Sequence, residues 1–286
     1  MCNENTSVSI SIMASQITQI VSILKKTYPD AKIVLNYGNN WELLVAVVLS
    51  AQCTDKKVNQ VTAKLFPKFR AIWLSSRGRP SGRGDLTSAR LPRRPDGTSG
   101  LLAMTDRLER QEVENFARAP IEELEQDIKS TGFYRNKAKN IQAAAKMILE
   151  KFDGKLPRTM AEMVTIPGVA RKTANVVLGN AYGVVEGIAV DTHVLRLSQR
   201  LGLVSRDKIG GGKKPLYYIK SGVKHLDYYK DASPEKIERE LMKIIPKKDW
   251  FKLTYLLIDH GREICKAQNP DCYYCPLREL CPVSRI

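Results

Sequence analysis

Apolar residues recur at helical spacing through most of the chain, and no segment sustains the apolar–polar alternation of a half-exposed strand. One helix face, for example, would carry Ile141, Ala144, Ala145 and Ile148. The segment from Trp41 to Gln52 is apolar almost all round, which indicates a helix buried among others. Another helix is expected to begin at Pro120, and Gly132 has the position of a C-cap. These patterns predict an all-α fold.

Two segments break the helical pattern. Between Arg77 and Gly100, Gly, Pro, Ser and Arg dominate and hydrophobic periodicity vanishes, so we expect a flexible surface insertion at about 71–110. It could be an arm attracted to polyanions, but we favour an expansion without function. The second, about 206–231, holds three consecutive glycines, several lysines and four tyrosines, with room for a short helix. Its tyrosines could stack on bases, although a solvated loop is the interpretation that we favour.

The composition restricts the class of partner. The chain has 46 Lys and Arg against 30 Asp and Glu, a formal net charge of +16. Such an excess favours nucleic acid or another anionic surface, although a basic surface without a partner has the same composition. The longest strongly apolar stretch, Leu43 to Leu49, is too short to span a bilayer, and no secretion signal is visible. We therefore expect no interaction with a membrane.

Four of the six cysteines crowd the C-terminal end of the sequence, spaced by six, two and five residues: Cys265, Cys272, Cys275 and Cys281. This asymmetry indicates a metal site in a reducing compartment and not a set of disulfides. Structural zinc sites commonly join two short Cys pairs, and only one C-x2-C pair is present. A single loop suits a cubane whose four irons each need one thiolate, so we favour a [4Fe–4S] cluster over zinc.

The expected cluster is better interpreted as structural than as an electron carrier. The sequence shows no flavin, nicotinamide or second-cluster motif with which it could exchange electrons. A cluster would fix the loop between the cysteines, and Lys266 and Arg278 could then be presented rigidly to phosphates. The alternative, which is equally supported, is that both side chains only face solvent.

A helix, a tight turn and a second helix are predicted around the segment from Ile166 to Asn175, which reads IPGVARKTAN. Backbone N–H groups at the start of the second helix have no partners within that helix, so a phosphate oxygen could accept hydrogen bonds from them. Gly168 would let the backbone approach the phosphate closely. An ordinary corner between two helices that contains glycine would have the same sequence pattern.

Lys172 favours the functional interpretation of this turn. It lies one or two residues into the second helix, beside Arg171 and the positive end of the helix dipole, which both disfavour its cationic form. A neutral lysine can act as a nucleophile, whereas one that stays charged would only bind phosphate.

Asp191 is expected to cap the next helix and could also stabilise positive charge developing on a sugar. The three histidines have no triad or metal spacing and are interpreted as structural or incidental.

Together these motifs resemble the endonuclease III family of helix-hairpin-helix DNA glycosylases. The resemblance rests on four motifs in the family's order: Ser50 to Asp55 (SAQCTD), Arg171 to Val177 (RKTANVV), Val190 to His193 (VDTH) and the four-cysteine spacing. It implies a six-helix barrel domain at 33–185 and an iron–sulfur cluster domain formed by 1–32 and 186–286. Double-stranded DNA would bind across the cleft between them.

The resemblance also implies residue roles. Lys172 would attack C1′ of a flipped-out nucleotide and form a Schiff base, assisted by Asp191. The enzyme would then be a DNA glycosylase and AP lyase that removes oxidised pyrimidines and cleaves 3′ to the abasic site. The residues expected at the DNA are Gln52, Asp55, Phe133, Gly168, Ala170, Arg171 and Lys266.

Within this set, Gln52 would fill the gap left by the flipped base, and Phe133 would wedge into the opposite strand. For Phe133, a hydrophobic contact after a helix C-cap is the alternative. Ala170 stands where the family often has a second glycine, a departure that we expect to be tolerated.

Two alternatives to this activity are a catalytically silent DNA-binding protein and a monofunctional mismatch glycosylase. The adenine-excising branch typically lacks the lysine and has a further C-terminal domain, whereas this sequence ends at Ile286, shortly after Cys281. Both differences favour the bifunctional branch. We expect a cytoplasmic monomer, associated with the nucleoid in a prokaryote.

Overall fold

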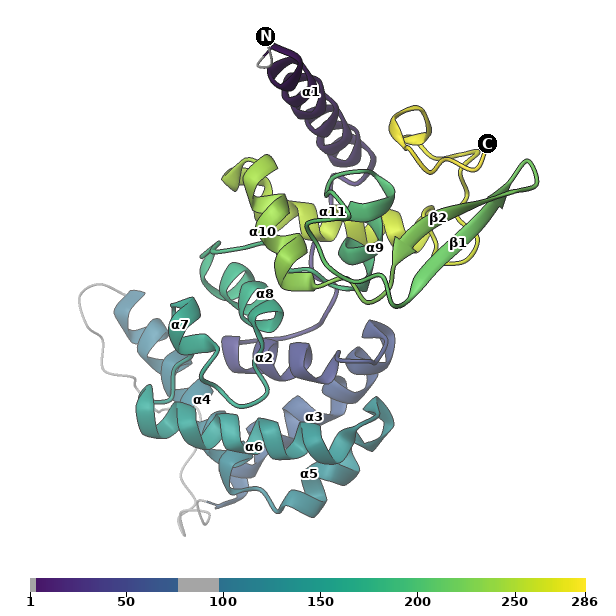
Figure 1. Ribbon diagram of the computed structural model, residues 1–286. Helices are drawn as coiled ribbons and strands as arrows, with labels where there is room; N and C mark the ends of the chain where they lie inside the picture. Colours follow the sequence, from purple (N-terminus) through teal and green to yellow (C-terminus); the bar gives the residue numbers. More distant parts are fainter. Residues whose placement is uncertain (1–3, 77–97) are drawn as a thin grey trace. The chain divides into compact units, whose positions relative to one another are not determined.

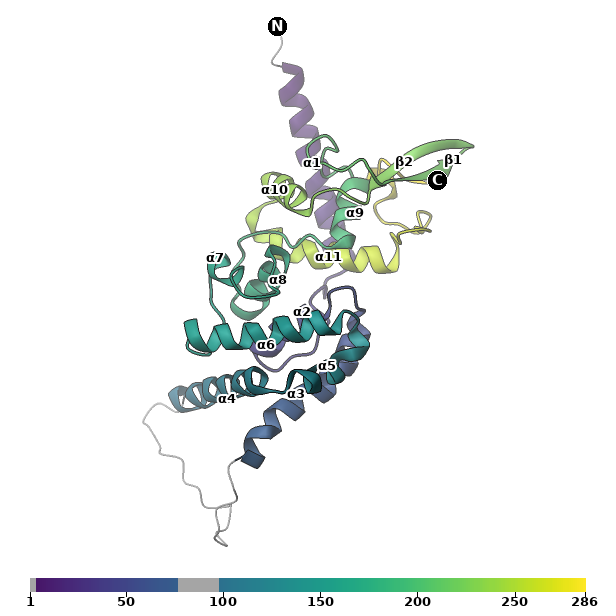
Figure 2. The same cartoon turned by 60° about the horizontal axis from the view of Figure 1, so that its bottom comes forward.

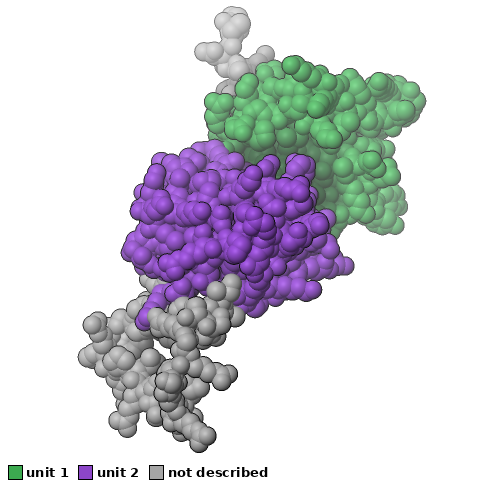
Figure 3. Space-filling model, turned by 90° about the horizontal axis from the view of Figure 1, so that it is seen from below, with its two compact units in different colours: residues 1–33, 185–286 green, residues 34–184 purple. Residues whose placement is uncertain are grey.

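A computed structural model describes residues 4–76 and 98–286 of the chain, which are mostly helical (Figure 1, Figure 2). Side chains are described for 15–70 and 107–286. The chain forms two compact units, coloured separately in Figure 3. Unit 1 comprises residues 1–33 and 185–286, and unit 2 comprises residues 34–184. Among the described residues, no helix is both long and apolar enough to cross a membrane.

Unit 2 is helical, and α2 lies at its centre. Its helices are α2 (Asn40–Leu49), α3 (Asp55–Ser76), α4 (Thr98–Arg118), α5 (Ile121–Ile128), the 3₁₀ helix η1 (Lys129–Thr131), α6 (Tyr134–Lys151), α7 (Met160–Met163) and α8 (Arg171–Tyr182). Every residue of α2 from Trp41 to Leu49 is buried, and the helix contacts α3, α4, α6 and α8. The predicted central helix is therefore confirmed, but it ends at Leu49, and residues 50–52 form a turn instead.

The first predicted insertion is helical at both ends. Helix α3 continues to Ser76, and α4 begins at Thr98, so the prediction of a flexible segment over all of 71–110 was too broad. The apolar residues at its two ends, AIWL at 71–74 and LLAM at 101–104, belong to these helices. Helix α4 packs on α3 and α6 in unit 2. Residues 77–97, the centre of that prediction, lie outside the described residues.

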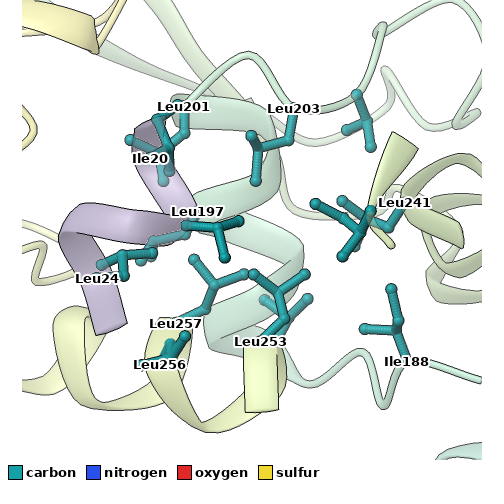
Figure 4. Close-up of a cluster of buried hydrophobic side chains, with 14 of the residues drawn as sticks. Ile20, Leu24, Ile188, Leu197, Leu201, Leu203, Leu241, Leu253, Leu256 and Leu257 are labelled. Carbon is teal, nitrogen blue, oxygen red and sulfur yellow. The ribbon is translucent and has the colours of Figure 1, made fainter. Parts of the chain in front are cut away.

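Unit 1 is built from both ends of the chain. Its elements are α1 (Glu4–Thr27), α9 (Thr192–Arg200), β1 (Pro215–Lys220), β2 (Val223–Tyr229), α10 (Pro234–Ile244), η2 (Lys247–Asp249), α11 (Trp250–Glu263) and η3 (Arg278–Leu280). Ile20 and Leu24 of α1 meet Leu197 of α9 and Leu257 of α11 in one apolar core (Figure 4). All four are essentially inaccessible, and this burial attaches the N-terminal helix to the C-terminal half of the chain.

The second predicted insertion, 206–231, carries a β-hairpin and not a short helix. Strands β1 and β2 pair antiparallel, with Tyr218 opposite His225. Ser221 and Gly222 both have positive φ, 50° and 77°, as a tight hairpin turn with the right twist requires. Both faces of the hairpin are partly exposed, so the sequence shows no clean alternation from which strands could be predicted.

A buried pair of carboxyl groups in unit 2 makes its stability depend on pH. Glu112 and Glu42 are both almost fully buried, and Asn39 Nδ2 donates to Glu112 Oε2 at 2.7 Å. Burial, followed by the negative charge of Glu42, raises the pKa of Glu112 to about 8. The folded state therefore holds a proton that the unfolded state, with an ordinary pKa of 4.5, releases.

The free energy of unfolding is therefore expected to fall as pH rises from about 4.5 to 8, by up to about 1.4 kcal/mol per pH unit. In Glu112→Gln the neutral amide replaces the protonated carboxyl, so most of this slope should disappear. Urea unfolding at several pH values measures both proteins. An unchanged slope in the variant would assign the pH dependence to other groups.

Candidate functional site

The predicted helix, turn and helix are present as α7, a turn and α8. Ile166 and Val169 are buried, and the N–H of Val169 donates to the carbonyl of Ile166 at 3.0 Å, which closes the turn. Gly168 lies between them with a φ of +79° and is exposed. A Cβ atom at this position would lie only 2.8 Å from Cβ of Asn140 on α6. Glycine is therefore required here by the turn and by the neighbouring helix.

Gly168→Ala is expected to lower the free energy of unfolding by about 1–3 kcal/mol, because alanine must adopt left-handed φ and displace Asn140. Ala170→Gly provides the matched control: Ala170 has an unstrained φ of −85°, so this change should cost less than about 1 kcal/mol. Urea denaturation followed by circular dichroism gives both values. Equal stabilities for the two variants would contradict the strain argument.

The start of α8 presents backbone donors and basic side chains together. Ala170 is the N-cap residue, and its side chain makes no capping hydrogen bond. Arg171 and Lys172 are the first two residues of the helix, and both are exposed. The methyl group of Ala170 introduces no backbone strain, as expected for this departure from the family pattern. An anion at this turn would therefore meet helix N–H groups, a positive dipole end and two cationic side chains.

Asp191 is held rigidly in unit 1. Its Oδ1 accepts hydrogen bonds from the backbone N–H groups of His193 at 2.9 Å and Val194 at 2.8 Å. The predicted N-cap of α9 is therefore confirmed. The side chain is half-buried, and its orientation is set by these two bonds.

Gln52 and Phe133 share an unusual backbone conformation in unit 2. Their φ values are 54° and 49°, and both residues are exposed. A non-glycine residue in this left-handed region costs roughly 1–2 kcal/mol, and such strain concentrates at functional sites. Phe133 is 65% exposed, so most of its surface is available to a partner and is not used in a hydrophobic contact. Asp55, the first residue of α3, is half-buried.

All four C-terminal cysteines line one pocket in unit 1. Each is a half-buried free thiol. Burial raises the pKa of Cys275 to about 11 and that of Cys281 to about 12. Thiolates at these positions therefore require a positive centre among them. Within the described part of the chain, no three His, Cys, Asp or Glu side chains are arranged to hold a single metal ion.

Arg200, for which no sequence pattern predicted a role, connects the β1–β2 hairpin to the cysteine loop. Its guanidinium is 1% exposed and donates to Cys265 Sγ at 3.3 Å, to the carbonyl of Lys266 at 2.8 Å and to Asp227 Oδ2 of β2 at 2.6 Å. Burial lowers the pKa of Arg200, but the hydrogen bonds and negative charges of Asp227 and Cys265 together more than offset this effect and raise it. A charged residue facing inward on α9 was the available signal, but its partners lie far away in the sequence.

His260 is a second residue beside the cysteines whose role the sequence did not specify. It is fully buried, its Nδ1 lies 3.2 Å from the hydroxyl of Tyr28, and its Nε2 lies 3.6 Å from Cys275 Sγ. Burial and then the charge of Arg196 lower the pKa of His260 to about 4, so the ring is neutral near pH 7. Its interpretation as structural agrees with these contacts. Lys266 and Arg278, on the same loop, are both exposed.

Comparison with known proteins places these features in a family. The HhH-GPD superfamily of base excision DNA repair proteins matches residues 45–210. Endonuclease III of Synechocystis sp. is 42% identical, over 94% of this chain and 92% of the relative. Endonuclease III of Bacillus subtilis is 41% identical, over 89% and 86%. The chain belongs to the endonuclease III family.

Solved structures agree with this assignment. A non-covalent endonuclease III–DNA complex is 38% identical with a TM-score of 0.68, and covers 94% of this chain and 95% of its own. A trapped covalent endonuclease III–DNA intermediate, also 38% identical and with the same coverages, has a TM-score of 0.69. The predicted helix-hairpin-helix glycosylase fold is thus confirmed, as is the enzyme class, a DNA glycosylase and AP lyase of base-excision repair.

Proposed function

We propose that the protein excises oxidised pyrimidines from double-stranded DNA and then cleaves the strand 3′ to the abasic site through a Schiff base on Lys172. The observation that carries this proposal is the exposed position of Lys172 on the first turn of α8, at a helix N-terminus where backbone N–H groups lack partners within the helix. A phosphate bound there would hold the neighbouring sugar within reach of the amine. The alternative of a silent DNA-binding protein does not require an amine at this position.

The reaction proceeds in two bond-breaking stages. The neutral Lys172 amine attacks C1′, and the base leaves with the glycosidic electron pair and takes up a proton that the attacking nitrogen loses. The bond between C1′ and the ring oxygen then breaks, the oxygen takes up a proton from water, and the resulting protonated imine acidifies the neighbouring C2′–H. Removal of that proton expels the 3′ phosphate by β-elimination. The Asp191 carboxylate, oriented by its two backbone bonds, would stabilise the positive charge that develops on the sugar.

Gln52 and Phe133 would hold the distorted duplex while the damaged nucleotide is extrahelical. The amide of Gln52 suits base edges in the gap, and the exposed ring of Phe133 suits stacking on the opposite strand. Arg171, Lys266 and the backbone at Gly168 would bind phosphates. Asp55 and Ala170 complete the proposed DNA surface.

A [4Fe–4S] cluster fits the four cysteines. All four border one cavity, and buried thiols of raised pKa need positive iron to ionise. When bound, the cluster would supply four iron–thiolate bonds. Arg200 and His260 would orient the sulfur atoms of Cys265 and Cys275. The fixed loop would present Lys266 to DNA. The protein would act as a monomer.

Borohydride trapping tests this function. The wild-type protein is incubated with duplexes that contain thymine glycol, an abasic site or no lesion, and covalent complexes are separated by denaturing electrophoresis. Complexes on both lesion duplexes, and none on intact DNA, are the expected result. Base release without any trapped complex would indicate a glycosylase that uses water. Binding without either product would indicate the silent DNA-binding protein.

A further inference from the structure

Lys137 is a buried lysine in the first turn of α6, in unit 2. Its side chain is almost fully buried, with 5% of the residue exposed. Its Nζ donates to the carbonyl of Leu49 at 2.9 Å and to the carbonyl of Thr131 at 2.8 Å. Burial lowers the pKa of Lys137.

These two carbonyls lie shortly before Gln52 and Phe133, the two residues described above with positive φ. Leu49 is the last residue of α2, three positions before Gln52, and Thr131 is the last residue of η1, two positions before Phe133. Because both oxygens bind one nitrogen, the segments that lead into Gln52 and Phe133 lie side by side. A cation also suits the C-terminal end of α2, where helix carbonyls lack partners within the helix and the dipole is negative.

Packing alone does not account for a lysine at this position. Methionine has a similar shape and would fill the volume without the cost of taking an ammonium group out of water. What lysine adds is a set of N–H donors on one atom, which can serve carbonyls from two separate segments.

We propose that Lys137 is a positioning residue that holds the Gln52 and Phe133 turns in fixed register, so that both side chains enter the duplex together. The inference rests on the proposed function. Lys137 itself contacts neither base nor sugar. It sets the spacing of two inserting side chains, and it is therefore needed for base flipping and not for imine formation.

The test compares Lys137→Met with Lys146→Met, which removes an equal charge from an exposed position on the same helix. Single-turnover release of thymine glycol from a duplex should fall roughly tenfold or more in Lys137→Met, because the inserting groups are misplaced. Trapping on a single-stranded abasic oligonucleotide, which needs no gap filling, should change less than about twofold. The fluorescence of 2-aminopurine opposite the lesion should lose its binding-induced change. Lys146→Met should match wild type throughout.

Full base release by a folded Lys137→Met would overturn the proposal. So would an equal loss on duplex and single-stranded substrates, since that would indicate a general defect. If Lys137→Met shows no cooperative thermal transition, Lys137→Gln, whose amide can donate to one of the carbonyls, is compared in the same way. Failure of wild type to trap on any abasic DNA would instead refute the proposed function.

Discussion

Lys172→Ala is expected to abolish borohydride trapping on both thymine glycol and abasic duplexes, and to reduce strand cleavage by roughly three orders of magnitude or more. Alanine removes the only atom that can form the imine in the proposed reaction. Binding to a duplex with a non-cleavable abasic analogue should weaken less than about tenfold, because one lost cation removes only a small part of the phosphate contacts. Electrophoretic trapping and fluorescence anisotropy measure the two effects separately.

The matched control for this variant is Lys146→Ala, which removes the same charge from an exposed position on α6. It should trap DNA as wild type does. Persistent trapping by Lys172→Ala would assign the nucleophile to another amine. Loss of binding in proportion to loss of cleavage would leave Lys172 as a phosphate ligand, the alternative that the sequence left open.

Cys281→Ala is expected to yield protein with much less iron than four atoms per chain and to lower the stability of unit 1 by roughly 4 kcal/mol or more, as loss of a metal site does. Three thiolates would then remain for four irons. DNA affinity should fall as well, because the loop with Lys266 is no longer fixed. Iron and sulfide analysis, visible absorption and urea unfolding of anaerobically purified protein measure these effects.

Cys53→Ala is the control for the cluster prediction. Cys53 is also a half-buried free thiol, but it lies in unit 2, outside the cavity lined by the four C-terminal cysteines. Its removal should leave the iron content unchanged. One zinc ion per chain in the wild-type protein, with no iron or sulfide, would contradict the cluster and favour the zinc site that the cysteine spacing argued against.

The residues best predicted from the sequence are those whose role depends on near neighbours in the chain. Asp191 caps a helix through N–H groups two and three residues away. Gly168 is required by a turn that closes within four residues, and α2 was predicted from its own apolar composition. Periodicity, capping and turn chemistry are local properties, so the sequence expresses them directly.

The sequence alone determined four features: the helical periodicity, the turn between two helices that precedes Lys172, the N-cap at Asp191 and the cysteine spacing. The tertiary structure decided the hairpin of β1 and β2, whose half-exposed faces carry no alternation, and the burial of Lys137 and Arg200. Lys137 Nζ binds a carbonyl 88 positions away, and Arg200 bonds to Cys265, 65 positions away. The reason is physical: a buried charge is stable only beside partners that folding brings to it, and no local pattern specifies partners so distant in the chain.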